Sequence, residues 1–232
     1  MNFFTFTKFG RMLLLLAAVL VVGLSGCGGG DDSNPANNTG GNNNGGNNNS
    51  GGDNPGGGGS LETVSLGGLK WMKKNLNVKT ADSWCYGNAD SNCVKYGRLY
   101  TWSAAKAACQ SVGMRLPTRE EWNALVTAAG GANTAGSKLK SSTGWNSYSG
   151  ISSTDEFHFS ALPGGYRYSD GLFYGAGNYG DWWPATEESG GGAYYRRMYY
   201  SYDGVSEGYG NANEYEDLGY KNDGFSARCV QD

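Results

Sequence analysis

The stretch AACQSVGMRLPTREEW, residues 107–122, places one cysteine close to two arginines and two glutamates. A thiol held beside acidic and basic side chains can act as a nucleophile, so Cys109 is a candidate catalytic residue. Glu121 in the same stretch is a candidate general acid or base. The elements that hold these two residues decide between a catalytic and a structural role.

Two predicted helices explain both residues without catalysis. Apolar residues recur at helical spacing over 101–112, with Cys109 among them. Thr118 and Glu121 have the spacing of a capping box, in which each side chain bonds to the backbone N–H of the other residue. Apolar residues then recur at helical spacing over 122–129. Glu121 is therefore interpreted as a helix cap.

The first 26 residues have the features of a secretory signal, with Lys8 and Arg11 before the apolar run MLLLLAAVLVVG. That run is too short to span a bilayer comfortably. The sequence Leu24-Ser25-Gly26-Cys27 resembles the lipobox of bacterial lipoproteins, which implies cleavage before Cys27 and acylation of that residue. An ordinary secretory signal is the alternative. We expect an exported lipoprotein anchored to the outer membrane.

Residues 27–60 are mostly glycine and asparagine and contain nothing that could anchor a core. We expect a disordered tether with a typical end-to-end distance of about 30 Å. Asp31 and Asp32 resemble an export signal that some Gram-negative groups use for the cell surface. The folded head is then predicted over 61–232, long enough for one domain. The head has a small net charge and no basic stripe, which argues against nucleic acid as a partner.

The head contains four cysteines, Cys85, Cys93, Cys109 and Cys229. An even number in an exported domain indicates disulfides, and four cysteines allow three pairings. A turn-rich segment separates Cys85 from Cys93, so a bridge between them is the easiest closure and leaves Cys109 with Cys229. A zinc site of four thiolates is the alternative. The spacing contains no Cys-x-x-Cys, so we expect no metal site.

His158 is the single histidine of the chain. It stands between Phe157 and Phe159 in what we expect to be an alternating strand, where a histidine is usually structural. No Ser/His/Asp set or metal triad can be assembled with one imidazole. We therefore expect a protein that is not an enzyme and that binds no cofactor.

From residue 157 onward, short runs rich in tyrosine and tryptophan alternate with glycine and aspartate, which predicts short strands and long loops. In AYYRRMYYSY, residues 193–202, alternation puts Tyr195, Arg197 and Tyr199 on the face opposite Met198. We expect that face to be the more exposed one. Tyrosine is favoured at recognition surfaces, so these three residues are candidates for ligand binding. The open alternative is that they fill a loop-rich fold.

Trp182 and Trp183 are adjacent, and in a strand only one of them can face the core. We expect Trp182 to lie in the core. Trp183 then becomes a fourth candidate for ligand binding.

The segment YTWSAAKAACQSVGMRLPTREEW (100–122) resembles the helix–loop–helix of the C-type-lectin-like fold, and RLPTREEW resembles the sulfatase-modifying, formylglycine-generating branch. Six further segments, in order, resemble the Fibrobacter succinogenes major paralogous domain. They are LKWMKKNLNVKT (69–80), SWCYGN (83–88), KYGRLYTW (95–102), FSALPGGYR (159–167), WWPATE (182–187) and GFSARCV (224–230).

The resemblance implies an α+β head with a C-type-lectin-like fold, in which two helices pack on short mixed or antiparallel sheets with long loops. It also supports the Cys109–Cys229 bridge. Formylglycine-generating chemistry uses a pair of cysteines in the C-terminal half, where this chain has only Cys229. The resemblance therefore implies the fold without the activity.

Acidic residues cluster at Glu187-Glu188, at Asp203 and over 214–217, where a Ca²⁺ site could form. The triplets by which sugar-binding C-type lectins hold calcium (Glu-Pro-Asn, Gln-Pro-Asp and Trp-Asn-Asp) do not occur in this chain. We therefore interpret these acids as solvated loop charge.

Together these features predict a surface lipoprotein whose head binds a glycan or a protein. An enzyme of the sulfatase-modifying type is one alternative. A display scaffold with loops that vary between paralogues over 182–223 is another.

Overall fold

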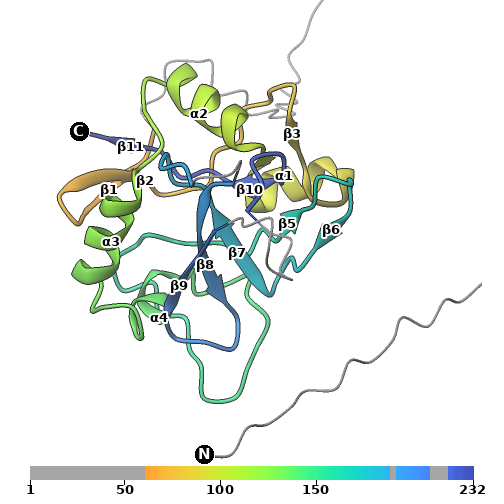
Figure 1. Cartoon of the computed structure of the whole chain (residues 1–232). Coiled ribbons are helices and arrows are strands. Elements are labelled where there is room, and N and C mark those ends of the chain that lie inside the picture. Colours follow the sequence, from red (N-terminus) through yellow and green to blue (C-terminus); the bar gives the residue numbers. More distant parts are fainter. Residues whose placement is uncertain (1–60, 189–191, 210–218) are drawn as a thin grey trace, which may run out of the picture. The chain divides into compact units, whose positions relative to one another are not determined.

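The computed structural model describes residues 61–188, 192–209 and 219–232 (Figure 1). The signal, Cys27 and the tether lie outside the described residues. The described chain is a mixed α+β head with few helices, several small sheets and two disulfides. Its helices are η1 (Tyr86–Asn88), α1 (Asp90–Tyr96), α2 (Trp102–Ser111), α3 (Arg119–Ala128) and α4 (Ala135–Leu139).

The strands of the described chain form three sheets. The first has the order β1 (Thr63–Leu66), β2 (Leu69–Met72) and β11 (Val230–Gln231). The second has the order β3 (Ser83–Trp84), β4 (Leu99–Tyr100), β10 (Phe225–Ser226), β7 (Tyr179–Trp182), β8 (Tyr194–Tyr199) and β9 (Val205–Tyr209). The third is the pair β5 (Tyr166–Arg167) and β6 (Phe173–Tyr174). Figure 1 shows β11 beside β2, so the two ends of the described chain meet in one sheet.

The structure confirms both predicted helices. α2 begins after Thr101, and α3 begins after Thr118 with the expected capping box. Thr118 Oγ1 accepts from the Glu121 N–H at 3.2 Å, and Glu121 Oε2 accepts from the Thr118 N–H at 2.7 Å. A hydrogen bond from Arg115 to the same carboxylate lowers the pKa of Glu121. Glu121 is thus fully engaged as a cap.

The centre of the core is a cluster of four buried rings, from Trp71, Trp122, Phe159 and Trp182. Trp71 and Trp122 meet edge to face at 4.9 Å between ring centroids, and Trp182 lies 6.1 Å from Trp122. Such edge-to-face pairs add to the gain from burying the rings. The prediction that Trp182 lies in the core is confirmed.

His158 lies in a turn, so the expected strand at this position is wrong. His158, Asp155 and Ser160 all have φ near +50° (54°, 49° and 53°), which a strand cannot accommodate. The Asp155 carboxylate closes the turn by accepting bonds from the backbone N–H and the hydroxyl of Ser160, at 2.7 and 2.6 Å. The His158 side chain is exposed. The Ser160 hydroxyl therefore donates to aspartate and not to histidine.

Arg228 is a fully buried cation that binds backbone carbonyls. Its guanidinium donates to the carbonyl oxygens of Met72, Lys73, Phe159 and Ser160 and to Asn75 Oδ1. Burial lowers the pKa of Arg228 to about 9, so the group stays charged at neutral pH. Arg228 thus joins the end of β2 to the turn that precedes residue 161.

Asn75 extends this network through the core. Its Oδ1 also accepts from Trp182 Nε1 at 2.9 Å, and its Nδ2 donates to the Tyr96 carbonyl at 2.9 Å. Asn75 therefore connects Arg228, β7 and the end of α1 at one buried point. A buried polar network in which the members satisfy one another fixes a unique arrangement of the elements around it.

The disulfides join Cys85 to Cys93 and Cys109 to Cys229, the two pairs that the sequence favoured. The second bridge ties α2 to the residue that precedes β11. It closes a separation of 120 residues. Constraining so long a loop in the unfolded chain contributes about 4–5 kcal/mol in the chain-entropy view.

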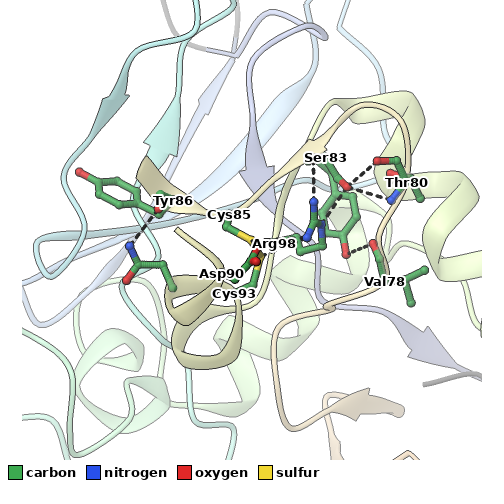
Figure 2. The surroundings of a disulfide bond; sticks show 10 residues. Val78, Thr80, Ser83, Cys85, Tyr86, Asp90, Cys93 and Arg98 are labelled. Atoms are coloured by element: carbon green, nitrogen blue, oxygen red, sulfur yellow. Dashed lines mark hydrogen bonds between the residues drawn. A yellow bond between two sulfur atoms is a disulfide. The ribbon is translucent and has the colours of Figure 1, made fainter. Parts of the chain in front are cut away.

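Arg98 lies against the shorter disulfide (Figure 2). Its Nη1 is 3.4 Å from Cys85 Sγ and 3.3 Å from Cys93 Sγ. Nε and Nη2 donate to the hydroxyl and the carbonyl of Ser83, at 2.9 and 2.8 Å, which fixes the guanidinium over the sulfurs. A cation in this position stabilises the thiolates that reduction would create.

Lys140, directly after α4, is a second buried cation. Its Nζ donates to the carbonyls of Tyr199 and Tyr202 at 2.7 and 2.6 Å and lies 5.2 Å from the centroid of the Trp145 ring. Burial lowers the pKa of Lys140 to about 8. Lys140 thereby holds the chain where it leaves β8.

We expect replacement of Arg98 by methionine to make the Cys85–Cys93 disulfide harder to reduce, because the thiolates lose their neighbouring cation. The equilibrium with dithiothreitol should shift about tenfold toward the disulfide, the effect of losing about 1.4 kcal/mol of hydrogen bonding to the charged thiolates. Differential alkylation and peptide mapping measure this shift. Arg98→Lys is the matched control because it keeps a cation. Reduction of Arg98→Met as readily as Arg98→Lys would contradict the prediction.

The buried Lys140 should make stability rise with pH between 8 and 9. In that range the unfolded chain binds a proton that folded Lys140 has begun to lose, so the free energy of unfolding increases by about 1 kcal/mol. Lys140→Met should be less stable overall and should lack this increase. Urea unfolding of both proteins at pH 8.0, 8.5 and 9.0 gives the comparison, and equal slopes would show that the prediction is wrong.

A candidate ligand-binding surface of tyrosine rings

Seven tyrosines from separate segments form one chain of contacting rings, here called the tyrosine band. Its members are Tyr148, Tyr166, Tyr168, Tyr174, Tyr179, Tyr199 and Tyr200. Tyr148 comes from the loop after α4. The others come from β5 and β8, each with the residue that follows it, and from β6 and β7.

Strand register creates the two stacked pairs of the band. Tyr179 of β7 lies directly opposite Tyr199 of β8, with ring centroids 4.5 Å apart. Tyr166 of β5 lies opposite Tyr174 of β6, at 5.9 Å. Aromatic residues that face each other across an antiparallel pair stabilise the sheet through this contact. The pleat of each strand pair therefore sets the positions of these rings.

A bridge between Gly165 and Gly180 joins the two strand pairs. Gly165 has φ of 67°, and a Cβ there would lie 2.4 Å from the Tyr174 carbonyl oxygen, so only glycine fits. Across this junction the Tyr166 and Tyr179 rings meet edge to face at 5.9 Å. The two pairs thus become one continuous chain of contacting rings.

The ends of the band are its most exposed parts. Tyr148 is 52% exposed and packs edge-on against Tyr200 at 5.6 Å, and Tyr174 at the other end is 41% exposed. Tyr199, between Tyr200 and Tyr179, is half-buried. Tyr148 and Tyr174 are therefore the two accessible rings of the band, and the rings between them are half-buried.

Arg197 lies within the band, but its charge is already matched. Nε and Nη2 donate to the two carboxylate oxygens of Asp181 at 2.7 and 3.0 Å, and Asp181 is fully buried. The guanidinium lies 4.6 Å from the Tyr179 ring centroid and 5.5 Å from that of Tyr166. Burial alone would lower the pKa of Arg197, but the Asp181 carboxylate outweighs burial and raises it. Arg197 is thus a support for the rings.

The hydroxyls of Tyr166, Tyr179 and Tyr200 stay protonated at neutral pH. Burial raises the pKa of Tyr166 and, together with hydrogen bonding to Tyr199, that of Tyr179. Hydrogen bonding to Tyr199 also raises the pKa of Tyr200. With Arg197 paired to Asp181, the band carries no net charge at neutral pH.

The expected exposure is wrong for two of the four predicted binding residues. Tyr195 is 6% exposed and packs on Phe225 at 5.2 Å, while Met198 on the opposite face of β8 lies in the tryptophan core. Both faces of this central strand are covered, so alternation does not mark an exposed side. Trp183 follows the end of β7, is fully buried and donates from Nε1 to the Tyr100 carbonyl at 2.7 Å.

Of the predicted residues, the structure brings Arg197 and Tyr199 together in the band. Sequence reasoning missed the other six members of the band, Tyr148, Tyr166, Tyr168, Tyr174, Tyr179 and Tyr200. The density of tyrosine beyond residue 157 was a usable signal for five of them. Their convergence depends on a strand register that alternation within a single segment does not reveal.

A network of charged residues on the edge of the sheet is structural. Glu207 of β9 pairs with Arg119 at 2.6 Å and with Arg196 at 2.5 Å. Arg196 also donates to Asn123 Oδ1 at 2.6 Å. These bonds fasten α3 to β8 and β9, and they leave the glutamate and both arginines paired with one another.

Within residues 61–188, 192–209 and 219–232, no three histidine, cysteine or acidic side chains are grouped so that they could hold a metal ion. Glu187 pairs with Lys221 at 3.1 Å, and Glu188 bonds to Tyr194. The acidic residues of 214–217 lie outside the described chain. A hollow of about 470 Å³ at the β1–β2 turn, lined by residues 65–70 and Asp232, has no aromatic side chain in its wall.

No helix in the described chain is long and apolar enough to cross a membrane. A model of the Fibrobacter succinogenes major domain family matches residues 64–231, which include the whole tyrosine band. Searches of curated proteins and of solved structures found no match. The match confirms the resemblance to this family. This chain belongs to the Fibrobacter succinogenes major domain family.

Proposed function

We propose that the head is a non-enzymatic recognition module that binds its ligand on the tyrosine band. The observation that carries this proposal is the continuity of the rings, which run from Tyr148 to Tyr174 without interruption. Tyrosine supplies a large, stiff contact area at little cost in side-chain entropy. Rings already held in place lose still less freedom when a ligand binds.

The covalent state of the cysteines supports a binding role over the sulfatase-modifying alternative. Cys85, Cys93, Cys109 and Cys229 are all in disulfides, so the head offers no free thiol from these four residues. His158 is exposed in a turn whose serine hydroxyl donates to Asp155. The four thiols are thus bonded to one another, and the Ser160 hydroxyl is bonded to Asp155.

We also propose that the head is displayed on the cell surface by a lipid on Cys27. The signal-like segment, the lipobox and the Gly/Asn-rich tether of 27–60 support this localisation. We propose a C-type-lectin-like relationship for the fold as well. The bridge from α2 to the final strand, Cys109–Cys229, is what that resemblance implies.

The band predicts which tyrosines matter for binding. Tyr148→Ala and Tyr174→Ala should each weaken the ligand found by a combined glycan and protein array about tenfold, a loss of about 1.4 kcal/mol. Binding by the purified protein is measured by titration. Tyr209→Ala is the matched control, because Tyr209 is 46% exposed on β9 and packs on Tyr194 outside the band. Unchanged binding by both band variants would contradict the proposal.

A further inference from the structure

Two asparagine side chains accompany the rings at the Tyr148 end of the band. Asn146 Nδ2 donates to Asn178 Oδ1 at 2.8 Å, in an exposed position. Within the described chain, Asn146 Oδ1 and Asn178 Nδ2 have no bond to protein. The Asn146 amide oxygen and the Asn178 amide NH2 are thus left for a ligand.

Backbone bonds place this amide pair among the tyrosines. The Asn146 N–H donates to the Gly177 carbonyl at 2.8 Å, and the Tyr200 N–H donates to the Asn178 carbonyl at 2.9 Å. Asn178 directly precedes Tyr179, and Asn146 is two residues before Tyr148. The amides therefore lie next to the exposed end of the band and are held by the strands that set the ring positions.

Gly177 makes room for the amide pair. It has φ of 86°, and a Cβ at this position would lie 3.1 Å from Asn146 Nδ2 and 3.2 Å from Oδ1. A residue larger than glycine would press on the Asn146 amide and would be strained in this backbone conformation. Glycine at position 177 thus leaves the space that the Asn146 amide occupies.

The charge of the surface decides which ligand class fits. The Arg197 guanidinium is paired with the buried Asp181 carboxylate, and Arg167 of β5 lies over the Trp84 ring and donates to the Tyr168 carbonyl, so the Tyr148 end of the band has no unpaired charge to offer an ionic ligand. An acidic group placed here would lose water without gaining a cation. Ring faces pack against the C–H faces of sugars, and an adjacent donor and acceptor match neighbouring hydroxyls. These features favour an uncharged polyhydroxyl ligand.

We infer that the ligand of this surface is a neutral oligosaccharide, whose sugar rings lie on Tyr148 and the tyrosines beside it and whose hydroxyls bond to Asn146 and Asn178. This inference rests on the proposed binding function of the band and specifies its ligand. A linear sugar chain can extend from Tyr148 toward Tyr174 along the row of rings. Neither a metal ion nor a charged side chain takes part in the contact.

The test is titration of the full-length protein in detergent with linear neutral hexasaccharides of glucose, xylose or mannose and with an oligogalacturonate of equal length. We expect at least one neutral hexasaccharide to bind, with less than a twofold change between 50 and 500 mM NaCl and no effect of EDTA. Asn146→Ala and Asn178→Ala should each weaken binding about fivefold, the effect of one hydrogen bond. Asn133→Ala is the control, since Asn133 bonds to Tyr202 away from the amide pair. Thermal melts verify that each variant is folded.

Three outcomes would overturn the inference. The first is that no neutral hexasaccharide binds, and the second is that only the oligogalacturonate binds and salt abolishes it. The third is that the asparagine variants bind the sugar as well as the Asn133 variant does. If Tyr148→Ala still weakens an acidic or protein ligand, the band remains the binding site and only the ligand class is wrong. If Tyr148→Ala and Tyr174→Ala leave all binding unchanged, the proposed function fails as well.

Discussion

The architecture of the head depends on one buried cation, Arg228. Its guanidinium binds carbonyl groups from β2 and from the 155–160 turn, and it meets the Asn75 amide, which also holds Trp182 of β7. Removing a charged group from water is costly, and here several backbone dipoles together replace its hydration. The carbonyl oxygens of Met72 and Phe159 would lose this donor if Arg228 were absent. Segments with little regular structure are thereby held at defined positions in the core.

The tyrosine band is a consequence of this arrangement. β10, which Arg228 closely follows in the chain, pairs with β7, and β7 places Tyr179 opposite Tyr199. Lys140 fixes the chain beyond β8 through two carbonyls, and the Arg197–Asp181 pair supports the rings from within the sheet. The buried side chains of Lys140 and Arg197 thus bond to backbone carbonyls and to a buried carboxylate. Neither charge is left free at the exposed end of the band. The Arg197–Asp181 pair thus both packs against the rings and leaves no net charge beside them.

Local spacing predicted those parts of the fold that local chemistry determines. The capping box at Thr118, the helical register of Cys109 and the short clip at Cys85 each depend on neighbours within a few residues or on cysteine pairing. Tyr195 and Trp183 were misplaced because the central sheet is covered on both faces, with Phe225 supplied from a distant part of the chain. The band is built from five segments of the chain. The bridge between Gly165 and Gly180 sets the position of the β5–β6 pair relative to β7 and β8. The hydrophobic periodicity of a single segment cannot predict a contact between two distant segments.

The pairing of β2 with both β1 and β11 has a mechanical consequence. Any tension on the chain before residue 61 enters the head at β1, an edge strand held to β2 by one ladder of four residue pairs. Behind it, β2 is braced by β11, by Arg228 and by the covalent link from Cys229 to α2. Under tension we expect β1 to separate from β2 before any other strand does, which lengthens the chain between the tether and the rest of the head. The strands that carry the tyrosine band belong to the other two sheets, so peeling of β1 leaves their pairing intact.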